Sequence, residues 1–182
     1  LIQCVLHLFL ILVKWRILIR YEIMSIRIGF GFDVHQLSES RDFWLGGIKI
    51  PHNKGGLGHS DADVLVHVIC DALLGAANLG DLGIHFPDTS SDFKNIDSKI
   101  LLKKVMILVR EKGFEISNID STICLEKPKL SPHIPKMKEV LSECMKISIE
   151  DLSIKATTTE KLSFVGREEG VSAYATVLID KI

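Results

Sequence analysis

The sequence predicts an α+β fold, a two-layer sandwich in which a mixed β-sheet has helices packed on one face. Strand and helix signals alternate along the chain from residue 26 onward. Few strand segments are long apolar runs, which are typical of strands buried on both faces of a parallel sheet. Hairpin-like connections are mixed with connections that cross over through a helix. These three observations favour the sandwich over a doubly wound parallel fold.

Glycines, prolines and capping residues set the expected boundaries of the elements. Residues 26–32 alternate with glycines, which predicts a strand whose end brings its backbone close to another group. Residues 43–50 are predicted as a strand with a bulge or bend at Gly46-Gly47, and residues 53–58 as a glycine-rich loop. Further strands are expected at 116–125, 152–159 and 171–179, with loops at 80–92 and 160–169.

Three helices are expected between these strands. Ser60 or Asp61 can cap the first, which runs to about residue 77 and is apolar over most of its circumference, as a core helix is. Asp97 or Ser98 opens the second, and Gly113 is its stop signal. The third is predicted over residues 133–145.

Composition limits the class of protein. A chain of 182 residues with 47% hydrophobic and 25% charged residues is long enough for one globular domain with a proper core. Its net charge of −1 gives no basic field for nucleic acid, so phosphate binding must come from local geometry. The four cysteines form no CxxC pair, which indicates reduced thiols in a cytoplasmic protein.

Residues 1–23 are expected to lie outside the fold. Residues 1–13 are almost wholly apolar, but this run is too short to span a bilayer. It also lacks the leading positive charge and the small-residue cleavage site of a secretory signal. We interpret the segment as an upstream extension before Met24, with a membrane-associating or targeting segment as the alternative. One domain is therefore expected over residues 24–182, with no membrane partner.

Two histidines and an aspartate are candidates for a metal site. Asp33 and His35 lie two apart on a predicted strand, so both side chains leave the same face. His67 lies on an otherwise apolar helix, where an unpaired imidazole is unfavourable. Three such ligands leave one zinc position open, as in catalytic sites. From spacing alone, a metal site and hydrogen-bonded histidines are about equally supported. Asp71, one turn after His67, can orient its imidazole or be a solvated side chain.

Other segments suit an anionic substrate, although each has an ordinary structural explanation. His59 and Ser60 precede a helix N-terminus, which binds anions but also needs a cap. Three threonines at 157–159 can hydrogen-bond phosphate oxygens, or can simply be β-favouring residues. Glu160 could hold a hard divalent ion such as Mg²⁺. The prolyl loop at 127–132 can present backbone groups to a heterocyclic base, or be a surface turn.

Together these segments resemble the 2-C-methyl-D-erythritol 2,4-cyclodiphosphate synthase family, over residues 26–181. The resemblance rests on six motifs in matching register. They are D-V-H at 33–35, H-S-D-A-D-V-x-x-H at 59–67, D-A-L-L-G-A-A at 71–77, G-D-L-G-x-x-F-P-D-T at 80–89, P-H-I-P at 132–135 and K-A-T-T-T-E-K-L-x-F-x-G-R-x-E-G at 155–170. One departure is Phe30, where members of the family often carry histidine at a position that is not a metal ligand.

The resemblance implies roles for individual residues. Asp33, His35 and His67 match zinc ligands, and Glu160 matches the ligand of a second ion, Mg²⁺ or Mn²⁺. Asp71, Thr158 and Glu160 are the positions expected to be catalytic, Asp71 as the acidic residue that supports the metal-binding helix. The expected substrate-binding positions are Asp33, His35, His59, Ser60, Asp63, Asp81, Gly83, Phe86, Asp88, Leu125, Lys129, Leu130, Ser131, Ala156, Thr157, Thr158, Thr159, Glu160, Phe164 and Arg167.

The resemblance also implies the reaction and the assembly. In the family, 4-diphosphocytidyl-2-C-methyl-D-erythritol 2-phosphate closes to the cyclic diphosphate and releases CMP, within the non-mevalonate isoprenoid pathway. The family is a homotrimer with active sites between subunits, which the sequence alone does not reveal. Two alternatives stay open: a zinc phosphoesterase that uses a metal-bound water, and a non-catalytic module that binds a nucleotide or an isoprenoid diphosphate.

Overall fold

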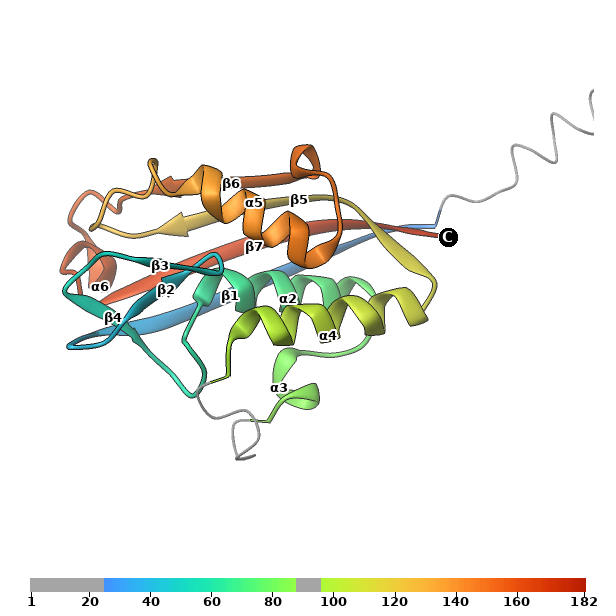
Figure 1. Cartoon of the computed structure of the whole chain (residues 1–182), viewed down its shortest axis with the longest axis horizontal. Helices are drawn as coiled ribbons and strands as arrows, with labels where there is room; N and C mark the ends of the chain where they lie inside the picture. The colour runs from blue at the N-terminus through green and yellow to red at the C-terminus, as the bar shows by residue number, and fades with distance from the viewer. Residues whose placement is uncertain (1–24, 88–95) are drawn as a thin grey trace, which may run out of the picture.

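A computed structural model describes residues 25–87 and 96–182 as two layers (Figure 1). One layer is a five-stranded sheet in the order β4-β1-β7-β5-β6. Strand β5 pairs in parallel with β6, whereas the pairs β1–β4, β1–β7 and β5–β7 are antiparallel, so the sheet is mixed. Helices α2, α4 and α5 lie together on one face of it. The predicted α+β sandwich is confirmed.

The strands and helices have the following bounds. The main sheet consists of β1 (Ile26–Glu39), β4 (Lys54–Leu57), β5 (Phe114–Cys124), β6 (Leu152–Thr157) and β7 (Gly170–Lys181), and a two-stranded sheet of β2 (Phe43–Leu45) and β3 (Ile48–Ile50). The helices are α2 (Val64–Ala76), α3 (Leu82–His85), α4 (Ser98–Glu111), α5 (Ile134–Met145) and α6 (Ser163–Gly166), with a 3₁₀ turn η2 (Ile149–Asp151).

The interface between β1 and α2 forms the centre of the core. Ten residues of α2, from Val64 to Ala76, are buried. Strand β1 presents Gly29 and Gly31 to this helix. The alternate side chains of β1, including Phe30 and Phe32, point to the other face of the sheet and are exposed. One strand therefore carries the packing surface for a helix on one side and an uncovered apolar surface on the other.

Two segments between β1 and α2 differ from the prediction. Residues 43–50 are not one bent strand but a hairpin, because Gly46 and Gly47 form a two-residue turn with φ of 63° and 77°. The segment predicted as a glycine-rich loop contains β4, which pairs with β1. The packing of β4 requires glycine at position 55, because a Cβ there would lie 2.1 Å from the carbonyl oxygen of Asp42.

Helix boundaries follow the capping residues. Asp97 caps α4 as predicted, through a hydrogen bond from Lys99 N–H to its carboxylate, and α5 begins just after His133. Helix α2 starts later than expected, because its cap is Asp63 and not Ser60 or Asp61. The segments 80–92 and 160–169, predicted as loops, contain the short helices α3 and α6.

The expectations for residues 1–23 lie outside the described residues. Within residues 25–87 and 96–182, no helix has the length and apolarity that crossing a membrane requires.

Candidate metal centre and nucleotide pocket

Two glycines allow helix α2 to approach β1 closely enough to form a site. A Cβ on Gly29 would lie 1.8 Å from the carbonyl oxygen of Ala72, and one on Gly31 would lie 2.0 Å from that of Val68. Both distances are impossible for non-bonded atoms, so this packing requires glycine at both positions. The next inward residues of β1 are Asp33 and His35, which therefore lie beside His67 of α2.

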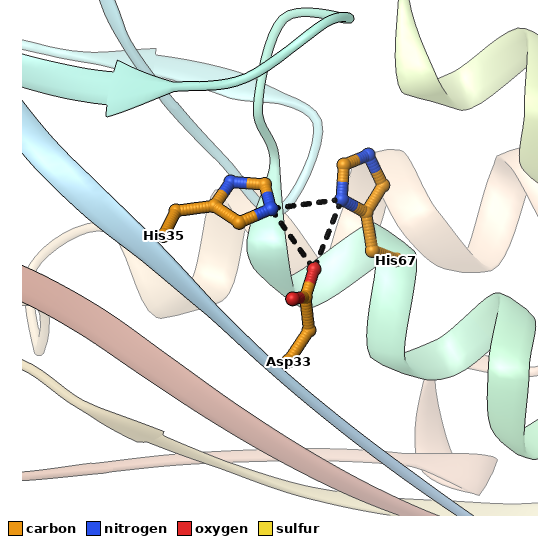
Figure 2. Close-up of side chains that lie close together, drawn as sticks. All are labelled: Asp33, His35 and His67. Atoms are coloured by element: carbon orange, nitrogen blue, oxygen red, sulfur yellow. Dashed lines mark hydrogen bonds and ion pairs between the residues drawn. The ribbon is translucent and has the colours of Figure 1, made fainter. Parts of the chain in front are cut away.

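Asp33, His35 and His67 converge on one point between β1 and α2 (Figure 2). Asp33 Oδ2 lies 2.9 Å from His35 Nε2 and 3.3 Å from His67 Nδ1, and the two ring nitrogens are 3.3 Å apart. Donor atoms around a tetrahedral zinc ion are separated by about 3.3–3.6 Å, given metal–ligand bonds of about 2.0–2.2 Å. The chemistry and spacing of these donors thus fit a divalent metal such as zinc.

His35 is held in the tautomer that ligation requires. Its Nδ1 lies 3.0 Å from the carbonyl oxygen of Ala62, and a carbonyl can only accept a hydrogen bond. Nδ1 therefore carries a proton, and Nε2, which faces Asp33 and His67, is the nitrogen left to bind a metal. A backbone carbonyl that orients a ligating imidazole in this way is typical of metal sites.

The electrostatics of the triad favour a charged carboxylate. Burial alone would raise the pKa of Asp33, but its hydrogen bonds with His35 and His67 lower the pKa well below its usual range. Burial alone would lower the pKa of His35, whereas the hydrogen bond and charge of Asp33 raise it, and the net pKa is raised. Asp33 is thus ionised, and it stabilises positive charge at the position where a cation would bind.

Asp71, which was predicted as a possible partner that orients the His67 imidazole, has another role in the structure. Asp71 Oδ1 accepts a hydrogen bond of 2.7 Å from Leu82 N–H, so this carboxylate holds the start of α3 against α2. The second nitrogen of His67, Nε2, instead lies 3.2 Å from Ser60 Oγ and 3.1 Å from Ser98 Oγ. Ser98 was not among the predicted site residues, because it lies 31 positions beyond His67 and reads as a helix-start residue.

The structure corrects the expected position of Asp63. Its side chain is fully buried, and its two oxygens accept hydrogen bonds from the N–H groups of Gly46, Gly47 and Val66. Asp63 therefore caps α2 and fixes the β2–β3 turn against the helix. A carboxylate so enclosed and so fully bonded is not available to a substrate, so its assignment to the substrate pocket is wrong.

Near the ends of β5 and β6, several predicted substrate-binding segments line a cavity of about 210 Å³. Leu125 N–H donates to the carbonyl oxygen of Thr157, which joins the end of one strand to that of its neighbour. The cavity is lined by Leu125, Glu126, Pro128, Lys129, Leu130, Ser131, Ile134, Ala156, Thr157 and Thr158. Residues that are 30 positions apart in the sequence thus share one concave surface, as the resemblance implied.

The remaining predicted positions surround these two centres. Thr158 Oγ1 donates to Glu160 at 3.0 Å, and Thr159 Oγ1 donates to the carbonyl oxygen of Leu162 at 2.6 Å. The segment from Thr157 to Glu160 is mostly exposed. Among the described residues, the only cluster found that could hold a metal is Asp33, His35 and His67, so Glu160 lies outside it. The second-metal role of Glu160 stays a prediction.

Two further groups complete the map. Asp81 caps α3 through Ile84 N–H, Gly83 lies within α3, and Phe86 packs against the core. Asp88 lies outside the described residues. Arg167 forms an ion pair with Glu169 through two hydrogen bonds. The Phe164 ring packs against Gly170, because a Cβ added to that glycine would lie 2.8 Å from a ring carbon. His59 is exposed at the loop before α2.

Fold and site define a two-layer α+β protein with a three-ligand metal centre beside one sheet strand. A family model described as the YgbB family matches residues 26–180. A curated relative from Bacteroides fragilis, 2-C-methyl-D-erythritol 2,4-cyclodiphosphate synthase, is 67% identical over 159 residues, which is 87% of this chain and 100% of the relative. The chain belongs to the YgbB family of 2-C-methyl-D-erythritol 2,4-cyclodiphosphate synthases.

Solved structures agree with this assignment. A 2C-methyl-D-erythritol-2,4-cyclodiphosphate synthase in a CDP-bound form has a TM-score of 0.79 and 37% identity, over 85% of this chain and 100% of that one. The bifunctional IspDF of Campylobacter jejuni has a TM-score of 0.85 and 42% identity, over 87% of this chain. This chain covers 43% of the length of that bifunctional protein.

Proposed function

We propose that this protein is a metal-dependent phosphorus–oxygen lyase that converts 4-diphosphocytidyl-2-C-methyl-D-erythritol 2-phosphate to 2-C-methyl-D-erythritol 2,4-cyclodiphosphate and CMP. This is a step of the non-mevalonate isoprenoid pathway. The single observation that carries the proposal is the convergence of Asp33, His35 and His67 in a chain that is 67% identical to a synthase of that name.

The reaction needs alignment more than proton transfer. The 2-phosphate of the substrate is already an anion, so it attacks the β-phosphorus without a side-chain base. A new P–O bond closes the eight-membered ring, and the bond to the departing CMP breaks. The barrier comes from repulsion between like charges and from the need for in-line placement. The residues of the chain therefore act by holding phosphates and by shielding their charge.

We assign the first metal to the triad and propose zinc for it. The carboxylate of Asp33 and the two ring nitrogens supply three ligands, and a fourth position remains for a substrate phosphate. Bound there, zinc would neutralise phosphate charge. The carboxylate of Glu160 is proposed to hold Mg²⁺ or Mn²⁺ against the same phosphates, with Thr158 positioned by its hydrogen bond to Glu160. Asp71 acts indirectly, because it keeps α3 docked on α2.

The 210 Å³ cavity at the ends of β5 and β6 is proposed to bind the cytosine base and the adjoining phosphate. Buried Leu125 and Leu130 supply apolar walls, and the exposed threonines 157–159 supply hydroxyl groups. The CDP-bound form of the related synthase supports this assignment. We propose that His59, Ser60, Asp81, Gly83, Phe86 and Asp88 contact the methylerythritol phosphate end.

We propose a homotrimer with active sites between subunits. The outer face of β1 exposes Ile28, Phe30, Phe32 and Val34, with Tyr174 of β7 beside them, and a contiguous apolar patch is typical of an interface. The sheet order also separates β1 from β6 by three inter-strand steps, roughly 14 Å. This spacing supports a substrate site that joins the triad of one copy to the nucleotide pocket of a neighbour.

Light scattering tests the assembly. The expected mass is three times the 20.3 kDa of one chain. Phe32→Glu should lower the mass, because it buries a charge in the proposed interface, whereas Ile107→Glu, on the exposed side of α4, should not. A wild-type protein with the mass of a single chain would contradict the trimer.

Residues 24–182 are proposed to form the whole synthase domain, in agreement with the family match to 26–180. A chain that starts at Met24 should then fold and turn over like the longer one. Aggregation or loss of activity would assign residues 1–23 a part in the fold. We place the protein in the cytoplasm, where the free thiols of Cys70, Cys124 and Cys144 stay reduced.

Product identification by phosphorus NMR tests the reaction directly. Incubation with the cytidyl substrate should yield CMP and a cyclic diphosphate. A linear phosphate product would instead indicate a zinc phosphoesterase. Binding of the nucleotide without turnover would indicate a non-catalytic binding module, and either result would overturn the proposal.

A further inference from the structure

We propose that Asp61 and Ser98 are positioning residues for the metal ligand His67. They form a hydrogen-bond relay, Asp61–Ser98–His67, which holds a proton on Nε2 of the imidazole and leaves Nδ1 to bind the metal. The inference rests on the proposed function in one respect only, the binding of a divalent metal by the triad.

The relay is built from short contacts around a buried serine. Ser98 is the first residue of α4 and is fully buried. Its hydroxyl lies 2.5 Å from Asp61 Oδ1 and 3.1 Å from His67 Nε2. Its backbone N–H donates to Asp61 Oδ2 at 3.0 Å, and Asp61 N–H donates to the carbonyl oxygen of Ile96 at 3.1 Å. Both carboxylate oxygens of Asp61 thus accept hydrogen bonds from Ser98, and Oδ1 also accepts a longer one, 3.3 Å, from Asp63 N–H.

The direction of each hydrogen bond follows from the chemistry of the groups. An ionised carboxylate can only accept, and a serine hydroxyl has a single proton to donate. The 2.5 Å contact places that proton toward Asp61. The remaining lone pairs of Ser98 Oγ can then only accept. Of the two groups within reach, His67 Nε2 lies at 3.1 Å and the Ser60 hydroxyl at 3.4 Å, so the shorter contact assigns a proton to His67 Nε2. With a proton held on Nε2, Nδ1, which faces Asp33 and His35, is the nitrogen of His67 that is left to bind a metal.

Ser60 does not duplicate this arrangement. Its hydroxyl lies 3.2 Å from His67 Nε2, but it accepts a hydrogen bond from Ala62 N–H and lies 3.4 Å from Ser98 Oγ. No carboxylate hydrogen bond to the Ser60 hydroxyl is found in the described residues, so its proton has no fixed direction. We expect Ser60 to retain part of the orientation when Ser98 is replaced, but not all of it.

The relay connects the metal centre to a second helix. His67 lies on α2 and Ser98 begins α4, so the ligand is oriented by a helix other than its own. Loss of such an indirect partner of a ligating histidine typically lowers metal affinity by roughly 10–100-fold. Ser98→Ala should fall within this range. Asp61→Asn should act in the same direction but less strongly, because an amide oxygen still accepts from the Ser98 hydroxyl.

Two measurements on the full chain test the relay. The first is the zinc dissociation constant, from competition with a chromophoric chelator, for the wild type, Ser98→Ala and Asp61→Asn. The second is the Nε2–H proton of His67 in the zinc-bound protein, followed by ¹H–¹⁵N correlation and by its rate of exchange with solvent. The wild type should show a slowly exchanging Nε2–H proton, and Ser98→Ala should show faster exchange. A structural effect on α4 that leaves the relay intact would not change this exchange rate.

Asp97→Ala is the matched control. Asp97 is adjacent to Ser98 and caps the same helix through Lys99 N–H, so its loss weakens the start of α4 without removing the relay. This variant should keep wild-type zinc affinity within about twofold. If Ser98→Ala does not fold, Asp61→Asn and the exchange rate of the wild-type Nε2–H proton still decide the question.

The outcomes separate the inference from the proposed function. A wild type that binds no zinc would overturn the metal assignment, and with it the premise of the relay. A wild type that binds zinc, together with a Ser98→Ala variant of equal affinity, would overturn the relay alone. A His67 Nε2–H proton that exchanges freely with solvent in the zinc-bound wild type would also overturn it.

Discussion

Gly31 faces the backbone of Val68 so closely that a Cβ at position 31 would lie 2.0 Å from the Val68 carbonyl oxygen. Each of the two residues neighbours a metal ligand on its own element. Asp33 is the next inward residue after Gly31 on β1, and His67 directly precedes Val68 on α2. The distance between strand and helix thus sets the distance between the ligands. Any change that moves α2 outward separates His67 from Asp33 and His35.

Gly31→Ala is therefore expected to impair both stability and metal binding. Relief of the clash requires a backbone shift, and overpacking of this kind costs roughly 1–3 kcal/mol of unfolding free energy. The same shift displaces His67, so zinc affinity should fall as well, because ligands tolerate only about 0.5 Å of displacement. Urea denaturation and chelator competition measure the two effects.

Gly75→Ala is the matched control for this prediction. Gly75 lies in the same helix with nothing within 4 Å of an added Cβ, so alanine should stabilise the protein by up to about 1 kcal/mol. Zinc affinity should stay at the wild-type value. Wild-type affinity in Gly31→Ala would show that the ligands adjust independently of the packing between β1 and α2.

Asp63→Ala should be strongly destabilising although it lies outside the metal site. Removal of the carboxylate leaves the N–H groups of Gly46, Gly47 and Val66 without their acceptor in a buried environment. We expect a loss of at least about 3 kcal/mol. Asp97→Ala removes a half-exposed cap and should cost about 1 kcal/mol. Equal losses in thermal or urea unfolding would contradict the anchoring role of Asp63.

The contrast between Asp63 and Ser98 shows what sequence patterns can predict. The triad was predictable, because the D-x-H spacing and a histidine on an apolar helix are local patterns. The starts of α4 and α5 were predictable as well, since caps are local. The role of Ser98 depends on where α4 begins relative to α2, and that is a tertiary contact. Asp63 was misassigned because the resemblance placed it among the substrate-binding positions, whereas the fold uses its carboxylate as the buried cap of α2.

The element β4 was missed for a related reason. Gly55 and Gly56 have low β-propensity, so this segment reads as a loop. The strand forms because glycine alone allows the backbone of residues 41–42 and the Ala62 methyl to approach it. Close tertiary packing therefore overrides the low β-propensity of glycine in β4. Close packing against α2 likewise accounts for Gly29 and Gly31 in β1.

His67→Ala should remove zinc and turnover while the fold is retained. Two ligands rarely hold a structural or catalytic zinc, and α2 owes its packing to the apolar residues around His67. Atomic absorption gives the zinc content, and circular dichroism gives the fold. His133→Ala, at the start of α5 where the side chain makes no capping hydrogen bond, is the control. Full zinc occupancy in His67→Ala would refute the metal assignment.

Glu160→Gln tests the second metal separately. Glutamine keeps an oxygen that can accept from Thr158 Oγ1 but loses the negative charge that a hard divalent ion prefers. Half-saturation should therefore require more Mg²⁺, with zinc content unchanged. Glu150→Gln, on the exposed turn η2, should leave the Mg²⁺ titration as in the wild type. An unchanged titration in Glu160→Gln would remove Glu160 from the site.

Asp71 should give the metal-free protein a measurable pH dependence of stability. Burial raises the pKa of Asp71 above its ordinary value of 3.8, against the lowering effect of the hydrogen bond from Leu82 N–H. At pH values between the ordinary pKa of the unfolded state and the raised pKa of the folded state, the folded state binds more protons than the unfolded state. The free energy of unfolding therefore falls as pH rises through this range. Asp71→Asn cannot ionise and loses this contribution. Its stability relative to the wild type should therefore increase from about pH 4 upward and then level off.

Asp120→Asn provides a control of opposite sign. The hydrogen bond from Lys155 lowers the pKa of Asp120, so its stabilising contribution is present above the unfolded pKa and is lost as pH falls. The stability of Asp120→Asn relative to the wild type should therefore decrease as pH rises. Urea denaturation at several pH values with chelator present measures both trends. A difference between Asp71→Asn and the wild type that is constant with pH would show that burial does not raise the Asp71 pKa.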